Sequence, residues 1–577
     1  METAQEVLEK EQPAYGRREV LVTMIGLLLI MFLGTLDQTI TATALPRIVG
    51  ELRDFTMATW VTTIYLIIAT VTVPIYGKLS DQFGRKPILF VGLGIFLGGS
   101  MLSGLAQTMT QLIIFRGVQA LGDGALIPIA SAVIGDLFSP RERARWMGIT
   151  TSAYGVATIV GPVLGGWLTD YASWRWIFYV NVPVGLIILP ILIFVMPSLK
   201  RSTRRVTIDY AGAATLVLGT GALMLGLSLV GSQYAWLSPQ VLSLFGGALL
   251  CLLAFLWYEM RLERQGREPI LEPSLFRRSA RVFGVSTSMS LLLGICTYGG
   301  AFYVPFFLQG VVGVSVTNSG LLLIPFALAS VAGAAGSGIL MGILGKYKWQ
   351  TILGVVIAIT GFLLLLRLDI DSSSAEVTLG MVVLGFGLGT GLAVFTTATQ
   401  NALPDKKGQV SASLAFFRQI GGAIGLASMG SVMNTTYLPT FLDAVPQRLQ
   451  QALPGNLLGI FENPSNLLEG PGMLAQIRAS FATRGPAGIA AFDQLLTAMK
   501  LGLTQGVHNV FLVCLGFILL AFIVIWFLRE QPLRSSKQQR SAAEDNEEGH
   551  SATLSRYGLR IRSSVSTRGK SSSGIPT

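Results

Sequence analysis

The chain is poor in the residues that carry redox, metal or hydrolytic chemistry. Its 577 residues include only three cysteines and two histidines. Cys251, Cys296 and Cys514 all fall inside apolar runs without CxxC spacing, so we expect neither a disulfide nor a metal site. His508 and His550 do not lie beside a nucleophile and an acid, which disfavours a hydrolytic enzyme. We therefore expect no enzymatic activity and no cofactor.

The sequence also lacks a nucleotide-binding motif and the pattern of a signal peptide. No Gly-x-x-x-x-Gly-Lys-Ser/Thr sequence occurs, which disfavours a built-in ATP motor and leaves an ion gradient as the expected energy source. Residues 1–19 are polar and acidic, without the short apolar core of a signal peptide. We expect the first apolar run to serve as the insertion signal.

Charge is scarce, at 13% of residues against 51% hydrophobic, whereas about 25% of residues are charged in soluble domains. Apolar runs of about 20 residues, long enough to cross a bilayer core of about 30 Å, recur along the chain. The sequence predicts an all-α polytopic membrane protein with fourteen spans. They lie near residues 20–45, 59–77, 88–106, 112–137, 146–168, 175–196, 209–230, 239–259, 282–308, 319–343, 350–368, 377–400, 410–433 and 508–528.

The cations concentrate in the connections SPRERARW, KRSTRRV, RLERQGREPILEPSLFRRSAR, GKYKW and LPDKKGQ, which alternate to one side of these spans. By the positive-inside rule that side is cytoplasmic, so we expect a multi-pass protein of the cell membrane with both termini inside. The net charge of +11 then reports topology, and we expect no nucleic-acid partner. We expect residues 434–507 to be external, and Phe492 to Gly506 have helical spacing suited to lying on the membrane or capping the entrance.

The stretch GKLSDQFGRKP, from Gly77 to Pro87, places a charged turn between two spans. Its glycines permit close packing or unusual backbone angles, and its acid can hold a helix end or an arginine across a cytoplasmic gap. An ordinary polar connection would explain the cations but not the interleaved glycines and acid. We predict a cytoplasmic gate made by Gly77, Asp81, Gly84, Arg85 and Lys86.

Four charged residues lie in the interior of predicted spans, away from the ends, where charge is costly and usually functional. They are Asp37, Arg116, Asp123 and Arg418. Asp37 and Arg116 have similar depths in the outer half and can pair, or share a proton through water. Arg116, Gln119 and Asp123 recur at i, i+3 and i+7, on one helix face that must point to a cavity. The alternative is an ion pair that merely joins two helices.

The fifth predicted span contains the run YGVATIVGPVLGGW. Small residues allow close helix packing, and an internal proline removes a backbone hydrogen bond and bends the helix. We predict a close-packed, kinked element. Its residues are Gly155, Gly161, Pro162, Gly165 and Gly166, and generic glycine packing is the alternative reading.

Together these segments resemble a known family. GKLSDQFGRKP is similar to the cytoplasmic signature of the major facilitator superfamily, LDQTITATALP to the first-helix signature of its drug:proton antiporters, and RGVQALGDGALIP to their fourth-helix signature. GVATIVGPVLGG resembles the antiporter signature of the fifth helix. Fourteen spans point to the subfamily of QacA-like and EmrB-like multidrug exporters, over residues 18–530.

The resemblance implies a fold of two six-helix bundles with two inserted helices. The expected parts are a cytoplasmic segment 1–19, an N-terminal bundle 20–196, inserted helices 7 and 8 with their linkers at 197–281, a C-terminal bundle 282–529 including the external loop, and a disordered cytoplasmic tail 530–577. The resemblance also implies proton coupling at Asp37 with Arg116, and a latch at Asp81 with Arg85. Asp123 departs from the pattern, which usually has a small residue there, and adds a second acid to the predicted proton-coupling set.

Arg418, in FFRQIGGAIG, either neutralises an acid or attracts the anionic head of a lipid-like substrate. Aromatic, hydroxyl and amide side chains suit a cavity for bulky amphipathic solutes, although each of them fits core packing equally well. The candidate cavity residues are Gln119, Tyr298, Phe302, Tyr303, Thr396, Thr399, Gln400 and Arg418.

The leading hypothesis is a secondary transporter that exports amphipathic or cationic compounds, as in multidrug efflux, in exchange for protons. One alternative is export or flipping of a lipid or glycolipid, and another is a membrane sensor or scaffold without transport, which would not need the charges inside its spans. The expected partners are the bilayer and a small amphipathic or lipid-like substrate. A periplasmic adaptor protein stays open as a further partner.

Overall fold

The computed structural model describes residues 16–52, 58–197, 209–230, 234–267, 269–314, 321–452, 461, 473–483 and 485–532. The chain divides into two units, Met1–Gln12 with Arg534–Thr577, and Pro13–Leu533. Everything below concerns the second unit. The expected disordered tail and most of the N-terminal segment lie outside the described residues.

The described secondary structure is helical apart from one isolated bridge between Val230 and Tyr234. It contains 14 helices long and apolar enough to cross a membrane, which confirms the predicted architecture. The first six spans are α2 (Arg17–Leu52), α3 (Ala58–Phe83), α4 (Arg85–Gly104), α5 (Met109–Leu137), α6 (Pro140–Tyr171), and the sixth, built from α7 (Trp176–Tyr179), α8 (Asn181–Pro190) and η1 (Ile191–Val195).

The other eight spans follow the same pattern of long apolar helices. They are α9 (Tyr210–Leu229), α10 (Pro239–Arg264), the ninth built from η2 (Ala280–Gly284), α12 (Val285–Phe307) and η3 (Leu308–Val312), then α14 (Ile324–Leu344), α15 (Lys348–Leu365), α16 (Ser374–Ala402), α17 (Lys407–Ala444) and α22 (Pro486–Ile525). Short helices lie between them: α11 (Pro273–Arg278), η4 (Pro404–Lys406), α18 (Gln447–Ala452) and α21 (Met473–Ala482).

Several spans begin where a polar side chain caps the free backbone N–H groups of the first turn. Thr108 accepts from the Gln111 amide before α5, Ser238 from Val241 before α10, and Ser373 from Glu376 before α16. Such caps satisfy donors that an apolar helix cannot satisfy itself. The start of these spans is therefore encoded locally.

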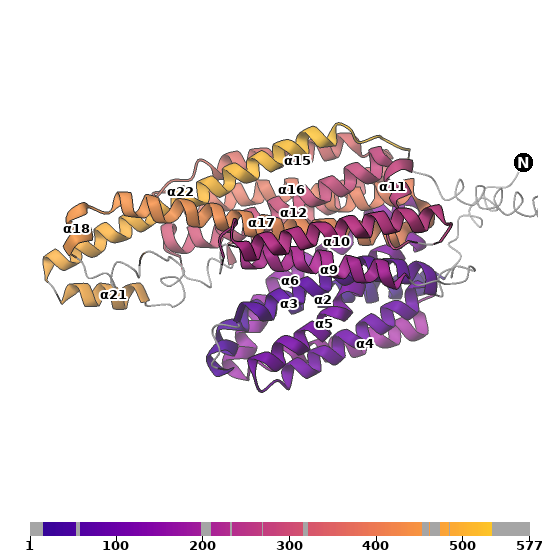
Figure 1. Cartoon of the computed structure of the whole chain (residues 1–577), viewed down its shortest axis with the longest axis horizontal. Coiled ribbons are helices and arrows are strands. Elements are labelled where there is room, and N and C mark those ends of the chain that lie inside the picture. Colours follow the sequence, from indigo (N-terminus) through magenta and orange to yellow (C-terminus); the bar gives the residue numbers. More distant parts are fainter. Residues whose placement is uncertain are drawn as a thin grey trace, which may run out of the picture. The chain divides into compact units, whose positions relative to one another are not determined.

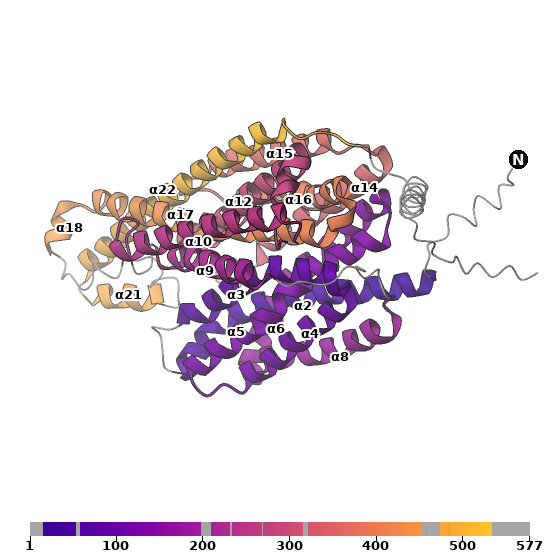
Figure 2. The same cartoon turned by 45° about the vertical axis from the view of Figure 1, so that its right-hand side comes forward.

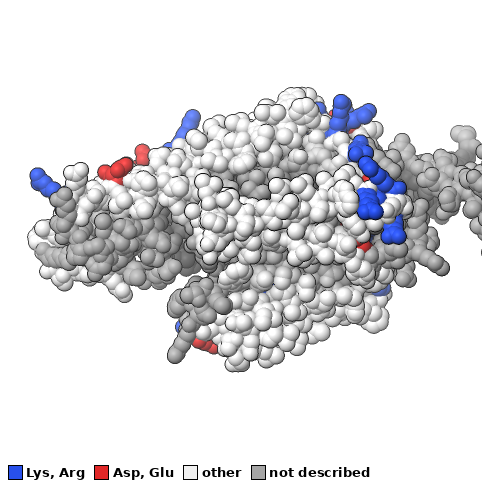
Figure 3. Space-filling view, viewed as in Figure 1, with Lys and Arg blue, Asp and Glu red and all other residues white. Residues whose placement is uncertain are grey.

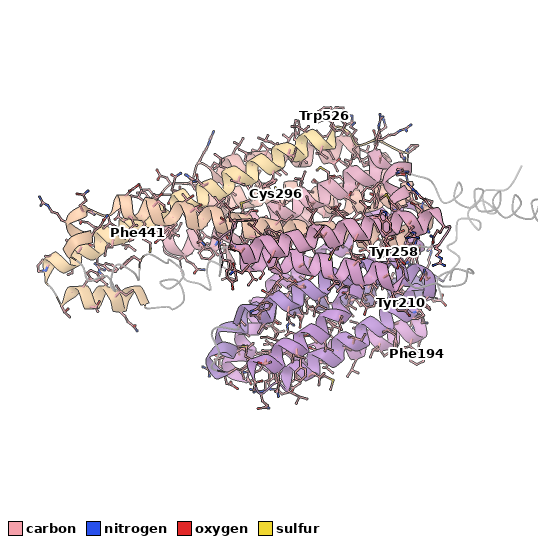
Figure 4. The ribbon with its side chains drawn as sticks, viewed as in Figure 1. Phe194, Tyr210, Tyr258, Cys296, Phe441 and Trp526 are labelled. Carbon is pink, nitrogen blue, oxygen red and sulfur yellow. The ribbon has the colours of Figure 1, made fainter. Side chains whose placement is uncertain are left out.

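The charged side chains mark the ends of the spans. On the face shown in Figure 3, Lys and Arg gather at the right-hand end and the broad middle is white. Phe194, Tyr210, Tyr258 and Trp526 lie toward that same end in Figure 4, where the first two are 82% and 75% exposed. Aromatic side chains are typical of the membrane–water boundary. We call this side the Asp81 end, because the turn at Asp81 lies there, and the opposite side the far end.

Buried side chains divide between the two halves of the chain. The largest core cluster draws its buried residues from positions 285 to 528. Two others draw theirs from positions 24 to 196, with Ala393 added to one. Helices α9 and α10 pair with each other, and α9 also contacts α3 and α17. Figures 1 and 2 show the first six spans in indigo and purple beneath the later helices.

The predicted external loop differs from its expectation. Helix α17 continues to Ala444, and α22 begins at Pro486 and runs unbroken to Ile525. With 38 and 40 residues, they measure about 57 and 60 Å at 1.5 Å per residue, roughly twice a bilayer core. In Figures 1 and 2 both extend together beyond the other spans, with α18 and α21 beside them.

The segment Phe492 to Gly506 is thus the first part of a spanning helix and not a separate helix lying on the membrane. Phe492, Leu495, Met499 and Leu503 are buried on one side of it, and Phe441 of α17 belongs to the same core cluster. The apolar face seen in the sequence is real, but it packs against α17 and its neighbours.

Candidate transport site

Asp37 of α2 lies at the centre of a fully buried polar cluster. Its Oδ2 accepts from Arg116 Nη1 at 2.6 Å, and its Oδ1 accepts from Gln119 Nε2 and Asn181 Nδ2, both at 2.7 Å. Arg116 Nη1 also donates to Gln119 Oε1 at 2.9 Å. A buried carboxylate is tolerated when paired and hydrogen-bonded, and three donors satisfy this one. We call these four residues the Asp37 cluster.

The Asp37 cluster joins helices of the first bundle that are distant in sequence. Arg116 and Gln119 come from α5, as the helical spacing predicted, and Asn181 comes from the start of α8. Asn181 also donates to Ser100 Oγ of α4 at 3.0 Å. The sequence interpretation missed Asn181, although an amide inside an apolar span is a signal of the same kind as the charges it used.

Asp123, the third predicted coupling residue, is buried beside this cluster but held differently. Its Oδ1 has no hydrogen-bond partner among the described residues, and it lies against Gly34 of α2, where an added Cβ would approach it to 2.9 Å. Tyr65 of α3 packs its ring under Arg116, with 4.0 Å from Cζ to the ring centroid, and places its hydroxyl near Asp123. The two acids therefore have different surroundings: Asp37 is satisfied and Asp123 has an open oxygen.

The predicted turn at the Asp81 end is a single residue. Helix α3 ends at Phe83 and α4 begins at Arg85, with Gly84 between them at φ +96°. This backbone angle is strained for residues other than glycine. The tight reversal brings Asp81 and Arg85 together, with 2.6 Å between Oδ1 and Nη1, and Arg85 Nη1 also donates to Ser80 Oγ at 2.8 Å.

Asp81 reaches across to the start of α17 in the second bundle. Its Oδ2 accepts from the Gln409 amide at 3.0 Å and its Oδ1 from the Gly408 amide at 3.3 Å. Exposed N–H groups and the helix dipole favour a negative charge at a helix N-terminus. Gly77 of α3 lies against the same turn, because a Cβ there would overlap the Ala412 side chain. Close approach of α3 and α17 explains why glycine stands at this position.

A second contact between the bundles was not foreseen. Asp136 of α5 accepts from Arg85 Nε at 2.9 Å and pairs with Lys407 of α17 at 3.2 Å. Lys407 also donates to the Gly135 carbonyl at 2.7 Å, as does Arg143 Nη2 at 2.6 Å. Burial lowers the pKa of Arg143 to about 10, so it stays charged at neutral pH and complements the carbonyl end of α5.

We call Asp81, Arg85, Asp136 and Lys407 the Asp81 cluster. Lys86, the last of the predicted gate residues, is not part of it. Its Nζ donates to the Ile193 and Met196 carbonyls at 2.9 and 3.0 Å. Both acceptors lie at the end of the sixth span, so the hydrogen bonds of Lys86 to the described residues join helices within the first bundle.

The linker after the inserted helices also reaches the Asp81 end. Glu272 pairs with Lys406 at 2.6 Å and with Lys78 at 3.9 Å, and Gln409 Nε2 donates to the Ile270 carbonyl. Residues 270–272 therefore contact α3 through Lys78 and the start of α17 through Lys406 and Gln409. The corresponding turn of the second bundle, at Gly345 to Trp349, lacks its own acid, and Glu530 supplies one by accepting from the Tyr347 amide at 3.0 Å.

The predicted glycine run of α6 packs on two sides. A Cβ on Gly155 would overlap Val331 of α14, whereas a Cβ on Gly161 or Gly165 would press on Thr39 and Ile40 of α2. Gly166 has nothing within 4 Å, so it does not serve close packing. The helix continues through Pro162, whose side chain lies outside the described residues.

A cavity of about 390 Å³ lies between the bundles. Its lining combines α2, α5 and α6 of the first half with α12, α14, α16 and α17 of the second. Met31 and Ile127 line it, each about one helical turn from Gly34 and Asp123 respectively. Asp123 therefore lies about one helical turn from the cavity, and neither buried acid is part of its wall.

Three of the predicted cavity residues line this space: Tyr298, Thr396 and Arg418. Four others do not, because their side chains are used elsewhere. Gln119 belongs to the Asp37 cluster, Tyr303 packs in the second-half core, Thr399 donates to its own helix at the Phe395 carbonyl, and Gln400 donates to Ser411 Oγ at 2.6 Å. The side chain of Phe302 lies outside the described residues.

Comparison with known proteins decides the family. Residues 27–426 match the model of the Major Facilitator Superfamily. The chain belongs to the major facilitator superfamily. It is 37% identical over 551 residues to the multidrug transporter protein MdtP of Bacillus subtilis (strain 168), covering 93% of this chain and 97% of that protein. It is 33% identical over 528 residues to multidrug resistance protein 3 of the same organism, covering 90% and 97%.

The fold of this superfamily member also matches solved structures. The proton:xylose symporter XylE, bound to 6-bromo-6-deoxy-D-glucose, has a TM-score of 0.55 at 12% identity, over 92% of this chain and 100% of that chain. At this identity the likeness shows the fold alone. Membership and the 14 apolar helices make the protein a multi-pass membrane transporter.

Proposed function

We propose that this transporter exports amphipathic compounds in exchange for protons. The observation that carries the proposal is a pair of buried acids in the first bundle, one of which, Asp123, lies about one helical turn from a cavity that both bundles line. The names of two relatives, a multidrug transporter and a multidrug resistance protein, support efflux of drug-like solutes. A volume of about 390 Å³ lies within the usual range for drug-sized ligands.

The two acids have separate roles in this proposal. Asp37 accepts from Arg116, Gln119 and Asn181, so a proton can bind it only if that cluster rearranges. Asp123 has an oxygen without a donor and is open to a proton in the observed arrangement. Passage of a proton between them would couple the cavity to the helix packing, because neutral and ionised states favour different conformations.

The Asp81 cluster supplies the second element, a closure at one end of the cavity. Asp81 binds the start of α17 and Asp136 binds Lys407, so three side chains join the bundles at what the charge pattern assigns as the cytoplasmic end. Breaking these contacts would open that end to substrate. Transport by alternating access requires such a reversible contact.

The test is substrate flux in proteoliposomes with an imposed pH gradient, comparing wild type with Asp37→Asn and Asp123→Asn. Each change keeps the side-chain size and removes the titration, so we expect pH-driven accumulation to be lost while folding and insertion persist. Glu259→Gln is the matched control, because Glu259 is a buried acid of inserted helix α10 that does not line the cavity.

The outcomes separate the two acids. Full pH-driven flux in the Asp37 variant would reject it as a coupling residue, and loss confined to the Asp123 variant would transfer the role to α5. Normal flux in both variants would refute proton coupling through this cluster.

A further inference from the structure

We propose that the cavity binds the acidic head of an amphipathic anion against Arg418, with the apolar part of the ligand along the remaining wall. The proposal deepens the function proposed above by naming a substrate class, and its binding test does not depend on proton coupling. Arg418 is the only charged side chain that lines the cavity among the described residues. An organic cation would therefore find no countercharge in this lining.

Arg418 differs from Arg116 and Arg85, which both have carboxylate partners. Arg116 is paired with Asp37, and Arg85 with Asp81 and Asp136. No carboxylate among the described residues lies within ion-pair distance of Arg418, which is half-buried in the cavity wall. A partly desolvated cation without a protein anion is costly. The sequence left open that Arg418 neutralises an acid of the protein. In the absence of such a partner among the described residues, the anionic head of a ligand would offset the cost of the charge.

The surroundings of Arg418 suit a carboxylate, sulfate or phosphate group. A guanidinium presents a planar fork of N–H donors that matches such groups. Tyr154 of α6 places its hydroxyl beside Arg418, and Tyr298 of α12 lies against Gly422, one turn further along α17. Both tyrosines line the cavity. An anion held here would accept from the second bundle through Arg418 and from the first through Tyr154.

The rest of the cavity suits the apolar part of one compact ligand. Ile127, Leu293, Phe326, Val331 and Phe395 form much of its wall, and burying apolar ligand surface there is favourable. The volume of about 390 Å³ accommodates a ring system or a single chain. A lipid with two chains would have to leave part of its apolar surface outside.

The test is equilibrium binding in nanodiscs of zwitterionic lipid without a pH gradient. The probes are dansyl-labelled decanoate and dansyl-labelled decylamine, which share a label and chain and differ in the charge of the head. We expect wild type to bind the carboxylate at least about ten-fold more tightly than the amine, and Arg418→Gln to weaken carboxylate binding by about 10- to 100-fold. Arg418→Lys should retain part of the preference, because it keeps the charge and loses the fork.

Thr158→Val is the control, because it removes a hydroxyl from the same cavity wall and should change the affinities for the two probes by similar factors. Thermal unfolding of each variant in the nanodisc verifies that it is folded. The proposal is overturned if wild type binds the amine as tightly as the carboxylate, or if a folded Arg418→Gln variant binds the carboxylate like wild type.

Competition with an anionic lipid distinguishes the source of the head group. Replacing part of the nanodisc lipid with phosphatidylglycerol would displace the carboxylate probe if lipid heads enter the site, which would support the anion site with a lipid as ligand. Unchanged probe binding would support a free organic anion. If wild type shows no anion preference but has pH-driven flux, this inference is refuted and proton-coupled export still holds. If wild type prefers the anion but has no pH-driven flux, proton coupling is refuted and the anion site still holds.

Discussion

Neutralising Asp81 should weaken the closure at the Asp81 end more than any other single change in the gate turn. In Asp81→Asn the carboxylate that accepts from the Gly408 and Gln409 amides is replaced by a neutral amide. Arg85 keeps its second partner, Asp136, at 2.9 Å. The change therefore removes mainly the negative charge at the N-terminus of α17.

The size of the effect follows from the geometry. The Asp81 side chain is only 16% exposed, and a charge at a helix N-terminus contributes between about 1 and 2 kcal/mol in partly buried positions. Since every 1.4 kcal/mol or so is ten-fold, the closed state should lose about 5- to 30-fold in population relative to the open state. Substrate affinity of a given state should change little, because Asp81 does not line the cavity.

Distances between spin labels across the Asp81 end would measure this shift. Arg145 of α6 and Lys346, after α14, are exposed and belong to different bundles, so cysteines at these two positions can carry the labels. Cys251 is partly exposed and is replaced by Ser in the background, whereas Cys296 and Cys514 are buried. In Asp81→Asn we expect a larger fraction of long distances than in the wild type.

Glu142→Gln is the control for a general effect of removing an acid at this end. Glu142 is exposed and hydrogen-bonds to Ser139 at the start of its own helix, so its loss should leave the distribution unchanged. An Asp81→Asn protein with the wild-type distance distribution and normal transport would refute the latch. A shift of similar size in Glu142→Gln would show that charge alone, and not the α17 contact, is responsible.

Two further predictions concern packing and topology. Gly161→Ala should destabilise the protein by about 1 to 3 kcal/mol, because the added Cβ would overlap Thr39 of α2. Gly166→Ala is the control, since a Cβ there has nothing within 4 Å and should leave the midpoint of thermal unfolding nearly unchanged. Equal midpoints for both variants would contradict the observed α2–α6 packing. A cysteine at exposed Thr483 should react with a membrane-impermeant maleimide in intact cells, and one at Lys346 only after permeabilisation, since the charge pattern assigns these positions to opposite sides. The reverse pattern would invert the proposed orientation.

The number and type of spans could be predicted from the sequence because the bilayer acts as a uniform solvent. Each span satisfies its own backbone hydrogen bonds, so a long apolar run is sufficient for a helix. The pairing of Asp37 with Arg116 could be anticipated for a similar reason, because two buried opposite charges at equal depth have few other partners. The glycines of the Gly77 to Pro87 connection were expected to permit unusual backbone angles, but only the structure shows that the reversal takes a single residue, Gly84.

The boundaries of the helices at the far end could not be predicted in the same way. The apolar run recognised in the sequence covers only residues 508–528, although helix α22 begins at Pro486. What keeps that extension helical is its buried face, with Leu495 and Met499 fully covered. This burial depends on α17 and its neighbours and is invisible in a local window.

The sequence by itself determined the class of the protein, the count of its spans and the burial of Asp37, Arg116 and Asp123, because these follow from composition and length along one helix at a time. Only the tertiary structure decided which side chains meet: Asn181 on Asp37, Lys407 on Asp136, and Tyr154 beside Arg418. It also removed Thr399 from the predicted cavity. These outcomes depend on how far each helix is rotated about its axis and which helix of the other bundle it faces, and a period of 3.6 residues specifies neither.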